Sequence, residues 1–426
     1  MGDHHLHSPP PSPDVDYISN LHDSLLLHIL CFLSTHDSVR TSVLARRWRS
    51  LWASVPTIVF DYYDFHPEAV SRADEIIHQF VASRRNSSAV FSLSINLSHV
   101  CPGAWIDYAK SHGVQSVALC LCYYPLQSPI FDTLFNCPSL VVLNLQFDED
   151  WPRVDIPPEC IALSNLKTLS LTLGVFSEES MRMLLACCLN LQDLRLDLTE
   201  CYDAAIEIAL PKLRTLLLTS TLSKTHINCP ILESLCIGGS SFLEEFHAYV
   251  PSLFYLHFGP LRWCHPLFSS LCNAAELGIS LVSLPADLEE HLSIIESFKF
   301  FHKIQKFKVH LHLRYEFTMQ LLFLFLLEIP DLHTLHLMDE TYEEEPFSPF
   351  SLIDDGWREF LQIMPSRSFN NLKLVLVQIQ SESARSTILE MLSEKVQEWD
   401  RVVVRYIAWK VKELRQVQQV KFNHQI

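Results

Sequence analysis

One short apolar pattern returns along most of this chain and constrains its fold more than any other feature. An apolar residue is followed by a second one three positions later and by a third one two positions further on, as in Leu140/Leu143/Leu145. From about residue 87 to Ala274 the copies begin 19 to 26 residues apart, and the later copies are more widely spaced. Self-similarity at such a period indicates a solenoid, in which each turn stacks on its neighbours. The other copies are Val90/Leu93/Ile95, Val114/Val117/Leu119, Leu166/Leu169/Leu171, Leu191/Leu194/Leu196, Leu213/Leu216/Leu218, Leu232/Leu235/Ile237, Leu253/Leu256/Phe258, Ala274/Leu277/Ile279, Ile304/Phe307/Val309, Leu332/Leu335/Leu337 and Leu372/Val375/Val377.

The spacing within each copy predicts a β-strand. Successive side chains of a strand point to opposite sides, so the second and third apolar residues point into the core together. The pattern L-x-x-L-x-L near this period is that of leucine-rich repeats. We therefore predict an α/β fold with parallel β-strands on the concave face and return helices at 178–188 and 318–327. A helical bundle is the alternative for a leucine-rich chain, but prolines before several copies favour strands entered from loops.

Composition and charge argue against several classes of function. The 426 residues carry a net charge of -17, which argues against a general nucleic-acid-binding role. The longest apolar stretch, 321–327, is far shorter than the roughly 20 residues of a membrane span. The polar, Pro-rich residues 1–15 do not fit a secretion signal, so the thirteen cysteines suggest a reducing compartment. We expect a soluble protein of the cytoplasm and/or nucleus.

No catalytic pattern stands out. The chain has no P-loop, no dinucleotide-binding glycine motif, no G-x-S-x-G and no H-E-x-x-H sequence, and it holds only nine glycines. None of its cysteine pairs has zinc spacing with a second ligand pair nearby. We expect no enzyme activity, no cofactor and no metal.

Residues 16–61 form a segment of a different kind. Leu26, Ile29, Leu30 and Leu33 recur at helical spacing, with Asp23 placed to cap the helix. A second helix, capped by Asp37, is predicted to carry Val43, Leu44, Trp48, Leu51 and Trp52. The segment is too small to bury both apolar faces, which indicates a docking surface for partner helices.

These residues resemble an F-box of the plant type. The motif D-x-I-S-x-L-x-D-x-L-L-x-x-I-L-x-F-L is matched from Asp16 to Leu33, and T-S-V-L-x-x-R-W-R-x-L-W from Thr41 to Trp52. The family motif has Leu-Pro where this chain has Leu21-His22, and again where it has Leu33-Ser34.

The resemblance extends to plant F-box/LRR-repeat proteins. Residues 105–109 and 112–115, WIDYA and HGVQ, are similar to a segment that follows the F-box in that family. Phe369 to Val404 is laid out like the closing FBD region, with a strand-like run followed by a helix-like run, although the usual lead-in is replaced. The predicted domains are a disordered N-terminus (1–15), the F-box (16–61), the repeats (62–340), and an acidic loop, beginning at Asp339, with an FBD-like cap (341–426).

The resemblance implies the substrate-recognition subunit of an SCF-type ubiquitin ligase. In that family the F-box binds a Skp-type adaptor, the adaptor joins a cullin scaffold, and the repeats bind an unknown protein target. An F-box/LRR scaffold that works outside a ligase is the alternative. For the adaptor contact, or the helix packing that shapes it, we select Leu21, Leu25, Leu26, Ile29, Leu30, Leu44, Trp48, Leu51 and Trp52.

One repeat strand stands out as a candidate target-binding surface. In the run 301–317 apolar residues alternate with basic residues and histidines, which places a basic row on the exposed side of the sheet. The simpler interpretation is a solvated strand face, whereas the sharper hypothesis is a receptor patch for an acidic or phosphorylated segment. The candidates are Lys306, Lys308, His310, His312 and Arg314 in this run, with His336 and Tyr255 at the same outward positions of flanking copies.

Overall fold

The computed structural model describes most of the regular elements of the chain. The described residues are 18, 20–65, 72–84, 89–98, 103–122, 130–147, 162–172, 178–198, 205–220, 224–238, 245–258, 271, 274–280, 303–311, 322, 325–326, 328–329, 331–339, 371–379, 382–395 and 402–406. The chain divides into two compact units, Met1–Trp151 with Cys160–Asn165, and Pro152–Glu159 with Leu166–Ile426. Each unit is described by itself below.

The first unit opens with a cluster of short helices. They are α1 (Asp23–Leu30), α2 (Thr35–Arg40), the 3-10 turn η1 (Thr41–Val43), α3 (Trp48–Leu51) and η2 (Trp52–Ser54). Their common core consists of Leu26, Leu30, Trp48, Leu51 and Val55. The single second helix predicted from the sequence is therefore wrong, because α2, η1, α3 and η2 are separate short pieces.

The predicted helix caps are also wrong. The ring Nδ1 of His22 accepts a hydrogen bond from the backbone N–H of Ser24, and the Ser34 hydroxyl accepts one from the N–H of Asp37. Asp23 is instead the first residue of α1 and forms an ion pair with Arg47 at 2.5 Å. Asp37 lies inside the first turn of α2, where a carboxylate also interacts favourably with the helix dipole.

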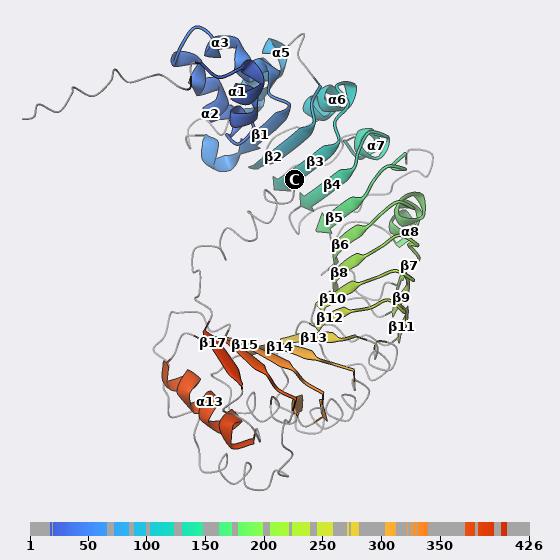
Figure 1. Ribbon diagram of the computed structural model, residues 1–426. Coiled ribbons are helices and arrows are strands. Elements are labelled where there is room, and N and C mark those ends of the chain that lie inside the picture. The colour runs from blue at the N-terminus through green and yellow to red at the C-terminus, as the bar shows by residue number, and fades with distance from the viewer. Residues whose placement is uncertain are drawn as a thin grey trace, which may run out of the picture. The chain divides into compact units, whose positions relative to one another are not determined.

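A parallel sheet continues the first unit. Strand β1 (Thr57–Asp61) pairs with β2 (Ser92–Ser98), β2 with β3 (Ser116–Cys122), and β3 with β4 (Val142–Phe147). After β1 come η3 (Tyr62–Asp64) and α5 (Ala73–Ser83). Helices α6 (Gly103–Ser111) and α7 (Ile130–Phe135) lie on one side of the sheet (Figure 1). The F-box segment thus supplies the first strand of this sheet.

Helix α6 ends in a Schellman motif. The N–H of Val114 donates to the carbonyl of Ala109, and the N–H of Gly113 donates to the carbonyl of Lys110. Gly113 has a φ of 75°, a conformation in which a side chain is strained. The glycine of the His112–Gln115 run therefore ends the helix and turns the chain into β3.

The second unit contains a longer parallel sheet. Its strands follow one another in chain order, apart from three that form a separate sheet (Figure 1). The register aligns the second apolar residue of every copy, so that Leu194, Leu216, Leu235 and Leu256 stand side by side and are fully buried. This confirms the predicted repeat core. The strands are β5 (Thr168–Thr172), β6 (Asp193–Leu198), β8 (Thr215–Ser220), β10 (Ser234–Gly238), β12 (Tyr255–Phe258), β13 (Glu276–Ser280), β14 (Lys306–Leu311), β15 (Thr334–Asp339), β16 (Leu374–Gln378) and β17 (Val403–Tyr406).

The separate sheet was not predicted from the sequence. Strands β7 (Ala205–Ile208), β9 (Lys224–Asn228) and β11 (Glu245–Tyr249) pair in parallel, and Figure 1 shows them on the same side of the main sheet as α8 (Glu178–Cys187). They stand where other repeats have a return helix. The copies here are only 19 to 22 residues apart, and an extended segment fills so short a return better than a helix does.

The C-terminal part has the predicted order of elements. Strand β16 is followed by α13 (Glu382–Lys395) and then by β17, which pairs with β16. Asp339 is a correction, because it is the last residue of β15 and is buried rather than part of a loop. Most of the helix predicted at 318–327 lies outside the described residues.

Candidate functional site

An apolar stripe runs along the solvent-facing side of α1. Leu25, Ile29 and Phe32 follow one another at helical spacing and are 50%, 43% and 77% exposed. Leu26 and Leu30, on the other side of the same helix, are fully buried in the helical core. The core therefore has its own leucines, and the exposed ones bury less apolar surface in it.

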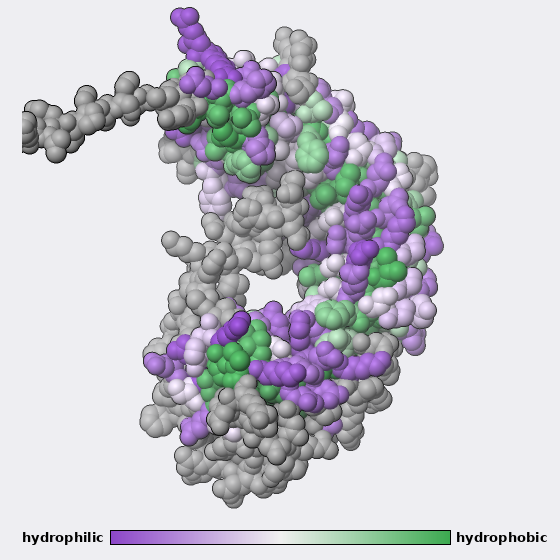
Figure 2. Space-filling view, viewed as in Figure 1, coloured by the Kyte–Doolittle hydropathy of each residue, from purple (hydrophilic) through white to green (hydrophobic). Residues whose placement is uncertain are grey.

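Further exposed apolar side chains lie in the segments before and after α1 and at the end of η1. Val43 and Leu44, at the end of η1, are 85% and 67% exposed, and Ile18 and Leu33 are also exposed. Figure 2 shows hydrophobic side chains gathered over α1 with hydrophilic ones at their margin. Large apolar side chains that cluster in water mark a surface for a partner. We call these seven residues the apolar face; they are Ile18, Leu25, Ile29, Phe32, Leu33, Val43 and Leu44.

The structure divides the nine residues selected from the sequence into two groups. Leu25, Ile29 and Leu44 belong to the apolar face. The other six are not part of it: Leu26, Leu30, Trp48 and Leu51 are buried in the helical core, Leu21 is half-buried against that core, and Trp52 is half-buried and packs on Phe80 instead.

Sequence reasoning missed four members of the apolar face as candidates, namely Ile18, Phe32, Leu33 and Val43. The helical spacing from Leu25 through Ile29 to Phe32 was the signal that could have found Phe32. Trp48, which was selected from the sequence for the adaptor contact or the packing behind it, is an interior residue with 5% of its surface exposed.

The short helices that carry the apolar face pack against β1 and α5. Thr35, the first residue of α2, accepts a hydrogen bond from the N–H of Val59 in β1 at 2.8 Å. The Trp52 ring packs on Phe80 of α5, with 5.4 Å between ring centroids, and Phe80 packs on Phe60 of β1. These contacts tie the small helices to the sheet.

Buried Arg84 completes this junction. Its Nε donates to the Tyr108 hydroxyl at 3.3 Å and its Nη1 to the Trp52 carbonyl at 3.4 Å, while the guanidinium lies over Phe80. One side chain thus joins η2, α5 and α6.

The second candidate surface lies on β12 to β15. The structure places Tyr255, Lys308, His310 and His336 half-buried on the side of the sheet away from the core. Lys306 is exposed and pairs with the Glu276 carboxylate at 3.4 Å. His312 and Arg314 lie outside the described residues.

Burial and charge both act on this surface. Burial, followed by the neighbouring charges of Lys308 and His310, lowers the pKa of His336 to about 4. Burial also raises the pKa of Tyr255 to about 12, with Cys236 and Glu276 adding to the effect. At neutral pH both side chains are therefore uncharged.

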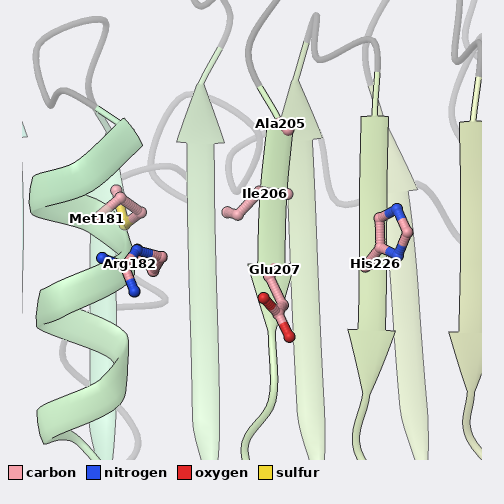
Figure 3. A pocket seen from close by; sticks show the side chains of 6 residues that line it. All are labelled: Met181, Arg182, Ala205, Ile206, Glu207 and His226. Carbon is pink, nitrogen blue, oxygen red and sulfur yellow. The ribbon is translucent and has the colours of Figure 1, made fainter.

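Two shallow hollows lie over the smaller sheet. One, of about 300 Å³, is lined by residues of α8, β7 and β9, among them Arg182, Glu207 and His226 (Figure 3). The other, of about 370 Å³, borders it and includes His247. One carboxylate oxygen of Glu245 lies 3.4 Å from Nε2 of both His226 and His247, so the two rings share this carboxylate. Among the described residues no group of side chains could hold a metal ion.

A small helical domain with an exposed apolar face, followed by leucine-rich repeats, defines the class of repeat proteins that carry an F-box. A family model described as the F-box domain matches residues 18–59. A second model, described as FBD-associated F-box protein At5g56370, LRR repeats, matches residues 103–256.

Relatives in Arabidopsis thaliana cover more of the chain. It is 35% identical over 248 residues to F-box/LRR-repeat protein At3g26922, a match that spans 54% of this chain and 77% of that protein. It is 28% identical over 355 residues to FBD-associated F-box protein At3g52670, spanning 81% of this chain and 77% of the relative. F-box/FBD/LRR-repeat protein At3g52680 is 31% identical over 258 residues, 58% of this chain and 51% of its own. The chain belongs to the F-box/LRR-repeat protein family, as predicted.

A membrane-crossing helix is not found: none of the helices in the described ranges is both long and apolar enough.

Proposed function

We propose that this protein is the substrate-recognition subunit of an SCF-type ubiquitin ligase. Its F-box would bind a Skp-type adaptor, the adaptor would link it to a cullin scaffold, and its repeats would hold a target protein. The observation that carries the proposal is the apolar face on α1 and η1, which is solvated in the isolated chain although a complete core lies beneath it.

The mechanism is proximity. The protein raises the effective concentration of a target lysine near ubiquitin-charged machinery and forms or breaks no bond itself. The junction at Arg84 and Trp52 is consistent with this role, because it holds the F-box helices against α5 and α6 of the same unit. Such a complex works in the cytoplasm or the nucleus.

The test is capture of the adaptor by matched variants of the full chain. Leu44→Asp and Ile29→Asp place a charge on the apolar face, where desolvating a carboxylate against an apolar partner is unfavourable. We expect a loss of at least about 2 kcal/mol in binding, or roughly 30-fold in affinity. Leu189→Asp is the control, because Leu189 is 56% exposed but lies in the second unit.

The wild-type chain and the control should co-purify with stoichiometric adaptor and cullin, and the two F-box variants should not. Circular dichroism must show the same fold for all four proteins. Capture of the adaptor by Leu44→Asp and Ile29→Asp at wild-type strength would remove the assigned face. Adaptor without cullin would favour the non-ligase scaffold instead.

A further inference from the structure

A row of nitrogen-bearing side chains crosses neighbouring strands of the second unit at a single level. The parallel register aligns His257 of β12, Gly278 of β13, Lys308 of β14 and His336 of β15. His310 lies two residues beyond Lys308 on the same side of β14. We call His257, Lys308, His310 and His336 the histidine–lysine patch.

Gly278 shapes this patch. A Cβ atom at this position would lie 2.3 Å from Nδ1 of His257 and 3.3 Å from the Tyr255 hydroxyl, so only glycine leaves room for these side chains. The His257 ring, lying over the glycine, comes to 5.5 Å from the ring of His310, centroid to centroid. The missing side chain therefore lets β12 and β14 share one surface across β13.

The charge of the surrounding face is uneven. Glu276 and Lys306 are aligned one step earlier in the register and pair with each other. Among the described residues of β12 to β17, those aligned in register with Lys308 or His310 include no Asp or Glu. Within the described ranges, the titratable or charged groups on this side around His336 are Tyr255 and His257 on β12, Glu276 on β13, Lys306, Lys308 and His310 on β14, and Arg405 on β17, while the described residues of β16 contribute none.

The surroundings of His336 affect both its hydrogen bonding and its pKa. Its Nε2 atom is buried and has no hydrogen-bond partner. Burial and the charges of Lys308 and His310 hold its pKa far below the usual range for histidine. An anion bound beside His336 would reverse the local positive potential.

We propose that the histidine–lysine patch binds the phosphate of a phosphorylated side chain in a target protein. The inference rests on the proposed function, since it names the class of target that the repeats recognise. Neighbouring strands are about 4.8 Å apart and successive same-side residues about 6.6 Å apart, so Lys308, His310 and His336 are close enough together to contact one small anion. A phosphate offers three oxygens to three such donors, whereas a carboxylate offers two.

The first experiment measures binding of a fluorescein-labelled peptide with one phosphoserine between glycines and serines. Lys308→Met removes the central charge, and Lys306→Met is the matched control on the same side of the same strand. Losing a hydrogen bond to a charged group predicts a fall in affinity of about 10-fold or more for Lys308→Met. Because Lys306 is engaged by Glu276, we expect less than about a 3-fold change for its variant.

The second experiment follows the imidazole resonances of the full chain by NMR against pH, with and without inorganic phosphate. We expect phosphate to raise the pKa of His336, since a nearby anion favours the charged ring. In Lys308→Met without phosphate the pKa of His336 should also rise, because a neighbouring positive charge is gone. A merely structural lysine at position 308 would not link these two readouts.

Three results would overturn the inference. They are failure of the phosphopeptide to bind, equal binding of a peptide with glutamate in place of phosphoserine, and equal losses for the two lysine variants. Capture of the adaptor is measured separately, so intact capture without phosphate binding would refute only this inference. Phosphate binding by a chain that captures no adaptor would refute the ligase role but leave the patch.

Discussion

Arg84 offers a sharp test of how the F-box is held on the repeats. Its side chain is 1% exposed, and no carboxylate of the described residues forms an ion pair with it. Replacing it by alanine removes both the guanidinium and the aliphatic stem, whereas replacing it by methionine keeps a stem of similar length. The two variants therefore separate the packing of Arg84 from its charge.

The structure indicates that packing contributes more. The two hydrogen bonds of Arg84, at 3.3 and 3.4 Å, are at the long end of the useful range, and its Nη2 atom is buried without a hydrogen-bond partner. Burying an incompletely satisfied charge is unfavourable, and this offsets the bonds and the guanidinium contact with Phe80. We expect Arg84→Ala to cost about 3 kcal/mol and Arg84→Met less than about 1 kcal/mol.

Hydrogen exchange measured by mass spectrometry on the whole chain reports the loss of stability at each segment. A global melting curve of a two-unit protein does not resolve it by segment. In Arg84→Ala, peptides covering η2, α5 and α6 should exchange faster than in the wild type, and peptides from the second unit should not change. In Arg84→Met all of them should stay near the wild-type rate. Equal losses of protection in the two variants would refute the reasoning, because the charge would then be the stabilising part.

Three further predictions concern single positions. Ser34→Ala removes the cap of α2 and should destabilise the F-box by about 1 kcal/mol in hydrogen exchange, while unchanged protection of α2 would show that the cap is dispensable. Gly113→Ala forces a side chain into a φ of 75° and should cost about 1 kcal/mol or more in urea unfolding, with Gly113→Asn costing less; equal costs would contradict the conformational argument. Burial, with Cys187 beside it, raises the pKa of Cys188 to about 12, so at pH 8 iodoacetamide should label Cys187 well before Cys188, and the reverse order by mass spectrometry would be inconsistent with this environment.

The repeat core could be predicted from the sequence because a single pattern specifies it many times. In every copy the second apolar residue is set by the pleat to lie beside its equivalent in the next strand, as Leu277 lies beside Phe307. A wrong assignment in one copy is corrected by comparison with the neighbouring copies. The same redundancy explains why the widely spaced copy at Val375 and Val377 was also found correctly.

The division between core and surface in the F-box could not be predicted with equal confidence. Leu25 and Leu26 are adjacent leucines, and helical spacing states only that they face different ways. Which of them faces inward depends on Trp48, Leu51 and Val55, which reach α1 from a part of the chain that breaks into short turns. The three-stranded sheet was missed for a related reason, since β7, β9 and β11 lie between repeats where no repeated pattern marks them.

The two helix starts of the F-box bear on whether this chain differs in function from its relatives. Where the family motif has proline, His22 and Ser34 have φ angles of -66° and -60° with extended ψ, and these φ values are those to which proline is restricted. The backbone enters both helices as a proline would direct it, and each side chain adds a cap that proline lacks. Proline stabilises such a position by restricting the unfolded chain, whereas a capping side chain does so through a hydrogen bond, and both effects are of the order of 1 kcal/mol. The backbone at both positions is therefore compatible with the family's prolines, and their absence provides no argument for placing this chain outside a ligase.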